Sequence, residues 1–479
     1  MRILIVDDSE QTPEGLRSSV SRGSDTQASS VSSRIFAALQ LPHIVTARLT
    51  RLHAARDKHS ATGTASPELP DITKLRLENS PELLATLLNT IGLAYLTNGD
   101  FEEAECFIEQ GLEIRLRIFG PEHPQTAASI NSLARVHRDA GRLDEALERV
   151  KEALGINSRV SGGDSLAVAG DLAVLASIEF QRGALTETEH AARSSLKIFE
   201  DRVQGSDPWV PYVLDLIARV HQWRSDYAKA SELYQRIREI DAKLYGRDHP
   251  VYAVRLHNYG TVLEARGDLQ DAKRKYDEAI DVLTKCSGES QPTLIDALGN
   301  RGALLITLKD FEGARRDLRE SLERNQKVRG ADHPMVGYSL MNLAQLAFEE
   351  GKFAECVRTL NDALTIFRAK LPEHHAYTAG ALTITGRALV QDQKPAEAEA
   401  PLEAASASWR VEFGERSPEY AIAQATLARA WFLQGKRLNE VEPILRASFA
   451  AVVAVRGEED PTAQLIRQWL KDVSSQSAC

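Results

Sequence analysis

NGDFEEAE, at residues 98–105, is the segment that decides the fold, because its pattern returns every 42 residues along this 479-residue chain. A glycine is followed two places on by an apolar residue and five places on by a small one. The glycine recurs at Gly99, Gly141, Gly183, Gly267 and Gly351, and the intervening steps hold Ser225, Lys309 and Gln393. Because glycine accepts the left-handed backbone conformation that ends a helix, we interpret these positions as turns between paired helices.

Small side chains recur on both sides of each turn. Five residues after it stand Ala104, Ala146, Thr188, Ala230, Ala272, Ala314, Cys356 and Ala398. Seven residues before it stand Gly92, Ala134, Ala176, Ala218, Gly260, Gly302, Ala344, Gly386 and Ala428. A large side chain at either position would hold two helices apart. The pattern therefore predicts that each first helix packs closely against its own second helix.

A loop containing glycine and proline separates one helix pair from the next. It reads FGPEHPQT at 119–126, YGRDHPVY at 245–252, RGADHPMV at 329–336 and FGERSPEY at 413–420. We expect the glycine to close the second helix and the proline to stand where the next helix starts. His123, His249 and His333 precede proline in equivalent loops, and this repetition predicts a structural hydrogen bond that stabilises the turn.

INSLARVHRDAGRLDEALE, residues 130–148, and the histidine–proline loop before it resemble the 42-residue tetratricopeptide repeats of kinesin light chain and its bacterial relatives. The resemblance covers about residues 85–462, or nine repeats, with a one-residue slip at GKRLNEVE, residues 435–442. It implies an all-α, right-handed α-solenoid of helix–turn–helix units whose first helices line a concave binding face. Residues 463–479 then predict a capping helix and tail that cover the last repeat.

The first 84 residues lack the repeat. MRILIVDDSEQTPEGLRSSV, residues 1–20, resembles the first strand and helix of a bacterial response-regulator receiver, with Asp7 and Asp8 as the acidic pair. Residues 41–56, where a receiver needs a phosphorylatable aspartate, contain no acid, which argues against a working receiver. We expect residues 1–34 to be mostly disordered because their serine-rich part offers little apolar surface to bury. Residues 35–84 are expected to form a helical and linker lead-in.

Composition narrows the classes of partner. The formal net charge is −10, and an acidic chain without a basic patch repels the phosphates of nucleic acids. Cys106, Cys286, Cys356 and Cys479 lack the close pairing of zinc sites and disulfide frameworks, which favours a reducing compartment. No apolar run reaches the ~18 residues of a membrane span. We expect a cytoplasmic protein with no cofactor and no nucleic-acid or membrane partner, and the sequence leaves its oligomeric state open.

Candidate binding residues lie on the first helices. Asn258, Asn300 and Asn342 stand two residues before the small residue in three consecutive repeats. An asparagine amide both donates and accepts hydrogen bonds, so a ladder of them can bind the backbone of an extended peptide. The family resemblance implies this use, and the alternative is that each asparagine bonds a neighbouring helix. Asn89, Asn131 and His257 occupy the adjacent position and extend the candidate surface.

Arginines follow the small residue by one place. These are Arg135, Arg219, Arg387 and Arg429. On a groove-facing helix they would hold acidic side chains or a carboxylate. The alternative is a solvated surface or internal ion pairs, which are common for arginine on helices.

No phosphate-binding loop, serine-nucleophile or zinc-protease motif appears in the sequence. We therefore expect an interaction scaffold, not an enzyme, which binds a peptide segment or a partner domain in its concave groove. The alternative is a detached sensor or regulatory arm of a bacterial signalling system. SPELLATLLNTIGLAYLTNGDFEEAE, residues 80–105, resembles the start of the repeats that follow bacterial serine/threonine kinases.

Overall fold

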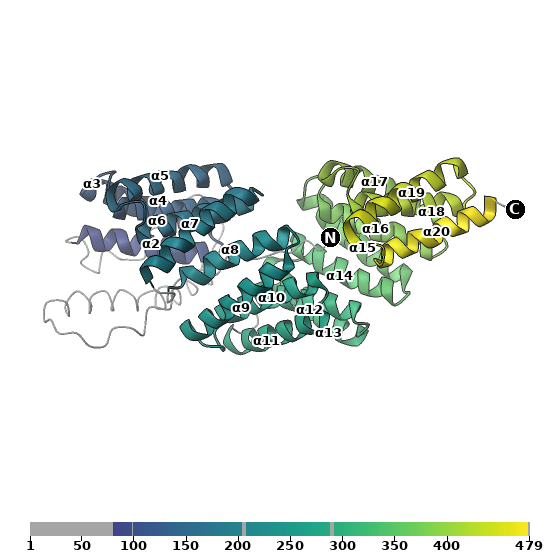
Figure 1. Cartoon of the computed structure of the whole chain (residues 1–479), viewed down its shortest axis with the longest axis horizontal. Helices are drawn as coiled ribbons and strands as arrows, with labels where there is room; N and C mark the ends of the chain where they lie inside the picture. The colour runs from purple at the N-terminus through teal and green to yellow at the C-terminus, as the bar shows by residue number, and fades with distance from the viewer. Residues whose placement is uncertain (1–79, 98, 204–206, 288–291, 478–479) are drawn as a thin grey trace, which may run out of the picture. The chain divides into compact units, whose positions relative to one another are not determined.

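The computed structural model describes residues 80–97, 99–203, 207–287 and 292–477, and within them every regular element is an α-helix (Figure 1). The expectations for residues 1–34 and for 35–79, including the receiver-like start, fall outside the described residues. Two compact units divide the chain between Arg266 and Gly267. None of the described helices is long and apolar enough to cross a bilayer.

The N-terminal unit comprises nine described helices. They are α2 (Pro81–Thr97), α3 (Phe101–Phe119), α4 (Pro124–Asp139), α5 (Leu143–Ser161), α6 (Leu166–Gln181), α7 (Leu185–Val203), α8 (Trp209–Trp223), α9 (Tyr227–Leu244) and α10 (Pro250–Arg266). The C-terminal unit comprises ten. They are α11 (Leu269–Ser287), α12 (Pro292–Thr307), α13 (Phe311–Arg329), α14 (Pro334–Glu349), α15 (Phe353–Lys370), α16 (Ala376–Gln391), α17 (Pro395–Phe413), α18 (Pro418–Leu433), α19 (Leu438–Arg456) and α20 (Pro461–Ser477).

Helices pack in pairs within each unit, as α2 with α3, α4 with α5 and α16 with α17. The predicted small residues lie where the paired helices meet. A methyl group added at Gly92 would lie 2.4 Å from Ile108 Cγ1, and one at Gly386 would lie 2.3 Å from Leu402 Cγ. The facing residues Ala104 and Ala398 are completely buried. The prediction that each first helix packs against its own second helix is confirmed for these pairs.

The turns inside the pairs adopt the left-handed conformation. Gly99, Gly141, Gly183, Gly267 and Gly351 have φ between 77° and 94°. Ser225, Lys309 and Gln393 have φ of 60°, 63° and 60°, so these turns form without glycine. At the slip in the last repeat Arg437 has φ of 45°. The repeat therefore determines the turn geometry even where the residue type does not favour it.

The loops between pairs end one helix and start the next as predicted. Gly120, Gly330 and Gly414 follow α3, α13 and α17 with φ of 80°, 88° and 80°. Helices α4, α10, α14 and α18 begin at the loop proline, whereas α8 begins one residue after Pro208.

The loop histidines cap the helices that follow them. The Nδ1 atoms of His123, His249 and His333 accept hydrogen bonds from the backbone N–H two residues on, at 3.2, 3.2 and 3.1 Å. His375 does the same at 3.1 Å. The predicted structural hydrogen bond is confirmed, and it satisfies a helix N–H that would otherwise lack an acceptor.

Each second helix meets the next first helix through a residue pair fourteen positions apart. Polar pairs are Arg115–Ser129 at 2.8 Å, Asn157–Asp171 at 2.7 Å and Asn325–Ser339 at 2.9 Å. An ionic pair, Asp241–Arg255, lies at 3.9 Å. Elsewhere the two positions hold buried apolar residues, as in Phe367 with Ala381 and Trp409 with Ala423. We call these positions the junction pairs.

Helix α20 packs as a single helix on α18 and α19. Ala463, Ile466 and Trp469 are buried in the same apolar cluster as Val441 and Leu445 of α19. Counted from the proline that begins each helix, Lys471 stands where the first helices of the repeats carry glycine or alanine. Helix α20 therefore lacks the close-packing site that first helices offer to their partners.

Candidate functional site

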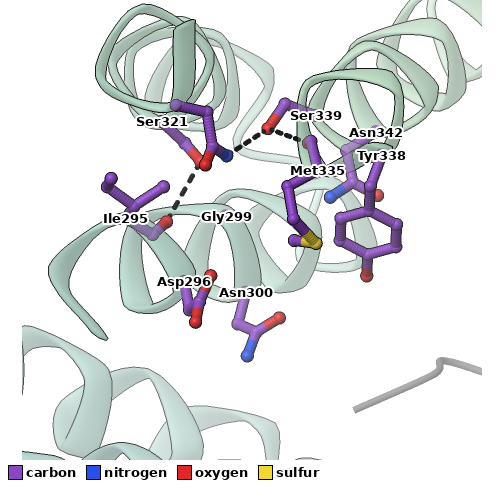
Figure 2. Close-up of a pocket in the computed structure, with 10 residues that line it drawn as sticks. Ile295, Asp296, Gly299, Asn300, Ser321, Met335, Tyr338, Ser339 and Asn342 are labelled. Atoms are coloured by element: carbon purple, nitrogen blue, oxygen red, sulfur yellow. Dashed lines mark hydrogen bonds between the residues drawn. The ribbon is translucent and has the colours of Figure 1, made fainter. Parts of the chain in front are cut away.

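A pocket between α12 and α14 of the C-terminal unit holds two of the three ladder asparagines. Asp296 and Asn300 extend from the same side of α12, and Tyr338 and Asn342 extend from α14 (Figure 2). Asn300 and Asn342 are half-buried. Because α12 and α14 are the first helices of consecutive repeats, the pocket lies where the sequence placed the ladder.

Polar side chains form the floor of this pocket, and most of their polar atoms have hydrogen-bond partners. Ser321 Oγ donates to the Ile295 carbonyl at 3.0 Å, and Asn325 Nδ2 donates to Ser339 Oγ at 2.9 Å (Figure 2). Asn325 Oδ1 is buried and has no hydrogen-bond partner among the described residues. A buried acceptor without a partner costs free energy until a donor reaches it. The pocket lining thus includes one buried acceptor without a partner among the described residues.

Two other candidate asparagines are used inside the fold. Asn258 is 3% exposed, and its Nδ2 lies 3.3 Å from Asp215 Oδ1 on α8. Asn131 Nδ2 donates to Asp171 Oδ1 on α6 at 2.7 Å. These contacts are the helix-to-helix bonds that sequence reasoning held as the alternative to a ladder.

His257 and Asn89, the remaining residues of the adjacent position, differ in burial. His257 is 3% exposed, and burial lowers its pKa to about 4. Asn89 Oδ1 is buried without a hydrogen-bond partner among the described residues. The imidazole of His257 is therefore enclosed, whereas Asn89 as a whole is half-buried, like Asn300 and Asn342.

Three of the candidate arginines stack on aromatic rings. The guanidinium carbons of Arg219 and Arg387 lie 4.1 and 4.9 Å from the ring centroids of Phe180 and Phe348. Arg429 lies 5.2 Å from the ring of Phe432 and also forms an ion pair with Asp472 of α20 at 2.9 Å. Stacking on an aromatic ring holds a guanidinium in place, and Arg219 is only 7% exposed.

Arg135 has a different environment. It forms no hydrogen bond or ion pair within the described part of the chain. Burial and then the neighbouring charge of Arg138 lower its pKa. Arg138 is itself paired with Asp139 at 2.6 Å, and Asp139 and Tyr212 partly oppose the lowering of the Arg135 pKa.

Sequence reasoning missed the contacts that surround Arg135. Arg138 Nη1 donates to Ser177 Oγ on α6 at 2.8 Å and to Tyr212 Oη on α8 at 3.4 Å, so Arg138 links three first helices.

Trp223 at the end of α8 is 62% exposed. Tyr212, Arg219 and Trp223 follow one helix face at spacings of seven and four, a periodic signal that a search limited to asparagine and arginine positions overlooks.

Comparison with known proteins agrees with this architecture. The sequence model of the tetratricopeptide repeat matches residues 83–159, 210–285 and 293–369. No curated protein matches the chain significantly.

Several solved structures are similar to this chain. The apo form of RapI has a TM-score of 0.56 and 14% identity, and the match covers 78% of this chain and 99% of RapI. The apo form of the quorum sensor NprR from B. thuringiensis has a TM-score of 0.55 and 15% identity, covering 79% of this chain and 99% of NprR. BtubC (BKLC) from P. vanneervenii has a TM-score of 0.41 and 20% identity, covering 48% of this chain and 91% of BtubC.

At these identities the likeness to RapI and NprR is one of fold. It agrees with the paired helices, the repeated close contacts and the capped loops described above. The three matched stretches show that this chain contains tetratricopeptide repeats, and the likeness to RapI and NprR shows the same helical fold over most of its length.

Proposed function

We propose that this chain is a non-catalytic interaction protein whose first-helix face binds an extended segment of a protein partner. The observation that supports the proposal most is the pocket between α12 and α14, where Asn300 and Asn342 project from consecutive repeats (Figure 2). The expected cytoplasmic location belongs to the same proposal and is tested by cell fractionation.

The chemistry of the pocket suits a peptide backbone. Each asparagine amide can donate to a backbone carbonyl and accept from a backbone N–H. Tyr338 adds a large ring beside them, and the carboxylate of Asp296 accepts donors from the bound segment. Aromatic side chains with adjacent polar groups are enriched among residues that dominate binding free energy.

In the N-terminal unit, Arg135 is the residue we propose to contact an acidic side chain of the partner. It is half-buried and has no ion pair among the described residues. Trp223 on α8 adds an exposed ring to the same unit. An acidic segment with an apolar anchor matches this combination.

The test is affinity capture from native lysate followed by identification of the partner and calorimetry with the purified partner. We expect the Asn300→Ala, Asn342→Ala double variant to weaken binding at least tenfold, because two bidentate contacts are lost. Asn361→Ala is the matched control, since Asn361 is exposed on the second helix α15. Circular dichroism of each variant checks the fold. Equal affinity of the double variant and wild type would show that binding lies elsewhere.

A second candidate function is the regulatory arm of a bacterial signalling system. The fold is shared with NprR, which is described as a quorum sensor. This support comes from likeness of fold alone. The identity of the captured partner therefore decides between a general interaction protein and a signalling arm. A kinase or receiver domain that binds the pocket variants less tightly than wild type favours the signalling role.

A further inference from the structure

Three charged side chains are buried together where α9 meets α8 and α10 in the N-terminal unit. Asp241 is 0% exposed, Asp215 is 3% exposed and Arg255 is 5% exposed. Two carboxyl groups therefore share one guanidinium in a region that excludes water. Asp241 and Arg255 form the only junction pair with charge on both sides among the described pairs.

The two carboxyl groups are not equally satisfied. Asp215 accepts a hydrogen bond from Tyr234 Oη at 2.9 Å and lies 3.2 Å from Arg255 Nη1. Both oxygens of Asp241 are buried without a hydrogen-bond partner among the described residues, and its nearest cationic atom, Arg255 Nε, is 3.9 Å away. An ionised Asp241 would thus be a desolvated charge without hydrogen bonds, next to a guanidinium already engaged by Asp215.

The groups that face Asp241 from each packed element do not compensate this charge. Helix α8 contributes Asp215, α10 contributes Arg255, and the residue that follows α9, Tyr245, contributes its phenol. Burial is the largest influence and raises the pKa of Asp241 to about 7, with Arg255 opposing and Asp215 reinforcing the shift.

We propose that the contact between α9 and α10 is proton-dependent: it closes with Asp241 protonated and loosens when Asp241 ionises. Asp241 binds its proton more tightly in the packed helices than in the separated ones. The stabilisation of the packed state is therefore complete below the ordinary aspartate pKa near 4 and is lost as pH rises through about 7. This device regulates the N-terminal unit and does not depend on the proposed binding function.

Hydrogen exchange of the full chain at pH 6.0 and 8.0, corrected for the intrinsic pH dependence of exchange, tests the proposal. We expect the local opening equilibrium of α9 and α10 to rise about tenfold between these values. The junction of α13 and α14 is the internal control, because its pair, Asn325 and Ser339, does not titrate in this range. Equal corrected protection of α9 and α10 at both pH values would overturn the proposal.

Two variants separate Asp241 from other titrating groups. Asp241→Asn keeps the shape of the side chain without its charge and is expected to abolish the pH dependence of exchange in α9 and α10. Asp201→Asn is the matched control because Asp201 is exposed on α7 of the same unit, and it should retain the tenfold change. Retention of the full pH dependence in Asp241→Asn contradicts the proposal, and the wild-type comparison remains decisive if that variant does not fold.

Discussion

At the scale of the residue, the close approach of paired helices depends on a single position in each first helix. Gly386 shows this most clearly, since an added methyl group would overlap Leu402. Gly380 lies on the same helix α16 but has its nearest neighbouring atom, Met341 Sδ, at 3.8 Å from an added methyl group. The two glycines therefore differ in packing while sharing one helix.

We expect Gly386→Ala to lower the free energy of unfolding by about 1–3 kcal/mol, because overpacking forces side chains and backbone apart. Gly380→Ala should raise it by about 0.5–1 kcal/mol, because alanine loses less backbone entropy in a helix. Urea denaturation of both variants measures the difference. A Gly386→Ala variant as stable as wild type would mean that the helices separate at no cost.

A second residue-scale prediction concerns Lys309, which turns the chain between α12 and α13 with φ of 63°. An L-residue is strained in this conformation and glycine is not, so Lys309→Gly should stabilise the C-terminal unit by about 1 kcal/mol. Lys309→Ala retains the strain and loses the 3.1 Å ion pair with Glu349, so it serves as the control for side-chain contacts. Thermal denaturation should rank glycine above wild type and wild type at or above alanine.

At the scale of the element, ion pairs join second helices to the turn that follows the next first helix. Glu189 of α7 pairs with Arg224 in the N-terminal unit. At the equivalent positions of the C-terminal unit the charges are exchanged, and Arg315 of α13 pairs with Glu350. The acidic residue can therefore stand on the second helix or at the turn, provided that its partner carries the opposite charge.

Arg315→Glu should destabilise the C-terminal unit because it places two carboxylates together, and the double variant with Glu350→Arg should recover most of the loss. The side chains of Arg315 and Glu350 are 21% and 15% exposed, and we expect a coupling of about 1 kcal/mol. A double-mutant cycle by chemical denaturation measures this term. Additive losses in the double variant would show that the pair does not interact.

The helical elements themselves follow from the sequence, and the junction pairs do not. Glycine, proline and small residues at a 42-residue period predict helices, turns and the partner of each helix. The period says nothing of whether a junction is Asn157–Asp171, Phe367–Ala381 or Asp241–Arg255. Positions fourteen apart are recognised as partners only when the stacked helices bring them into contact.

At the scale of the whole molecule, each repeat is stabilised mainly by its neighbours, so the last repeat depends on α20. Trp469→Ala removes a side chain that is 8% exposed and should cost about 3–5 kcal/mol locally. Hydrogen exchange should show lost protection in α18, α19 and α20, with α2 to α5 unchanged. Trp223→Ala is the control because that ring is 62% exposed. A loss of protection spread through both units would contradict nearest-neighbour stabilisation.

The sequence by itself determined that the chain is a repeat of paired helices, because glycine, proline and small-residue positions act through local backbone conformation and contacts between adjacent helices. Only the tertiary structure decided how each candidate side chain is used. Asn300 and Asn342 lie in a pocket, whereas Asn258 occupies the equivalent position yet bonds Asp215 in the interior. The reason is physical: whether an amide faces a partner or a neighbouring helix depends on the residues of the next repeat, which the 42-residue period does not specify.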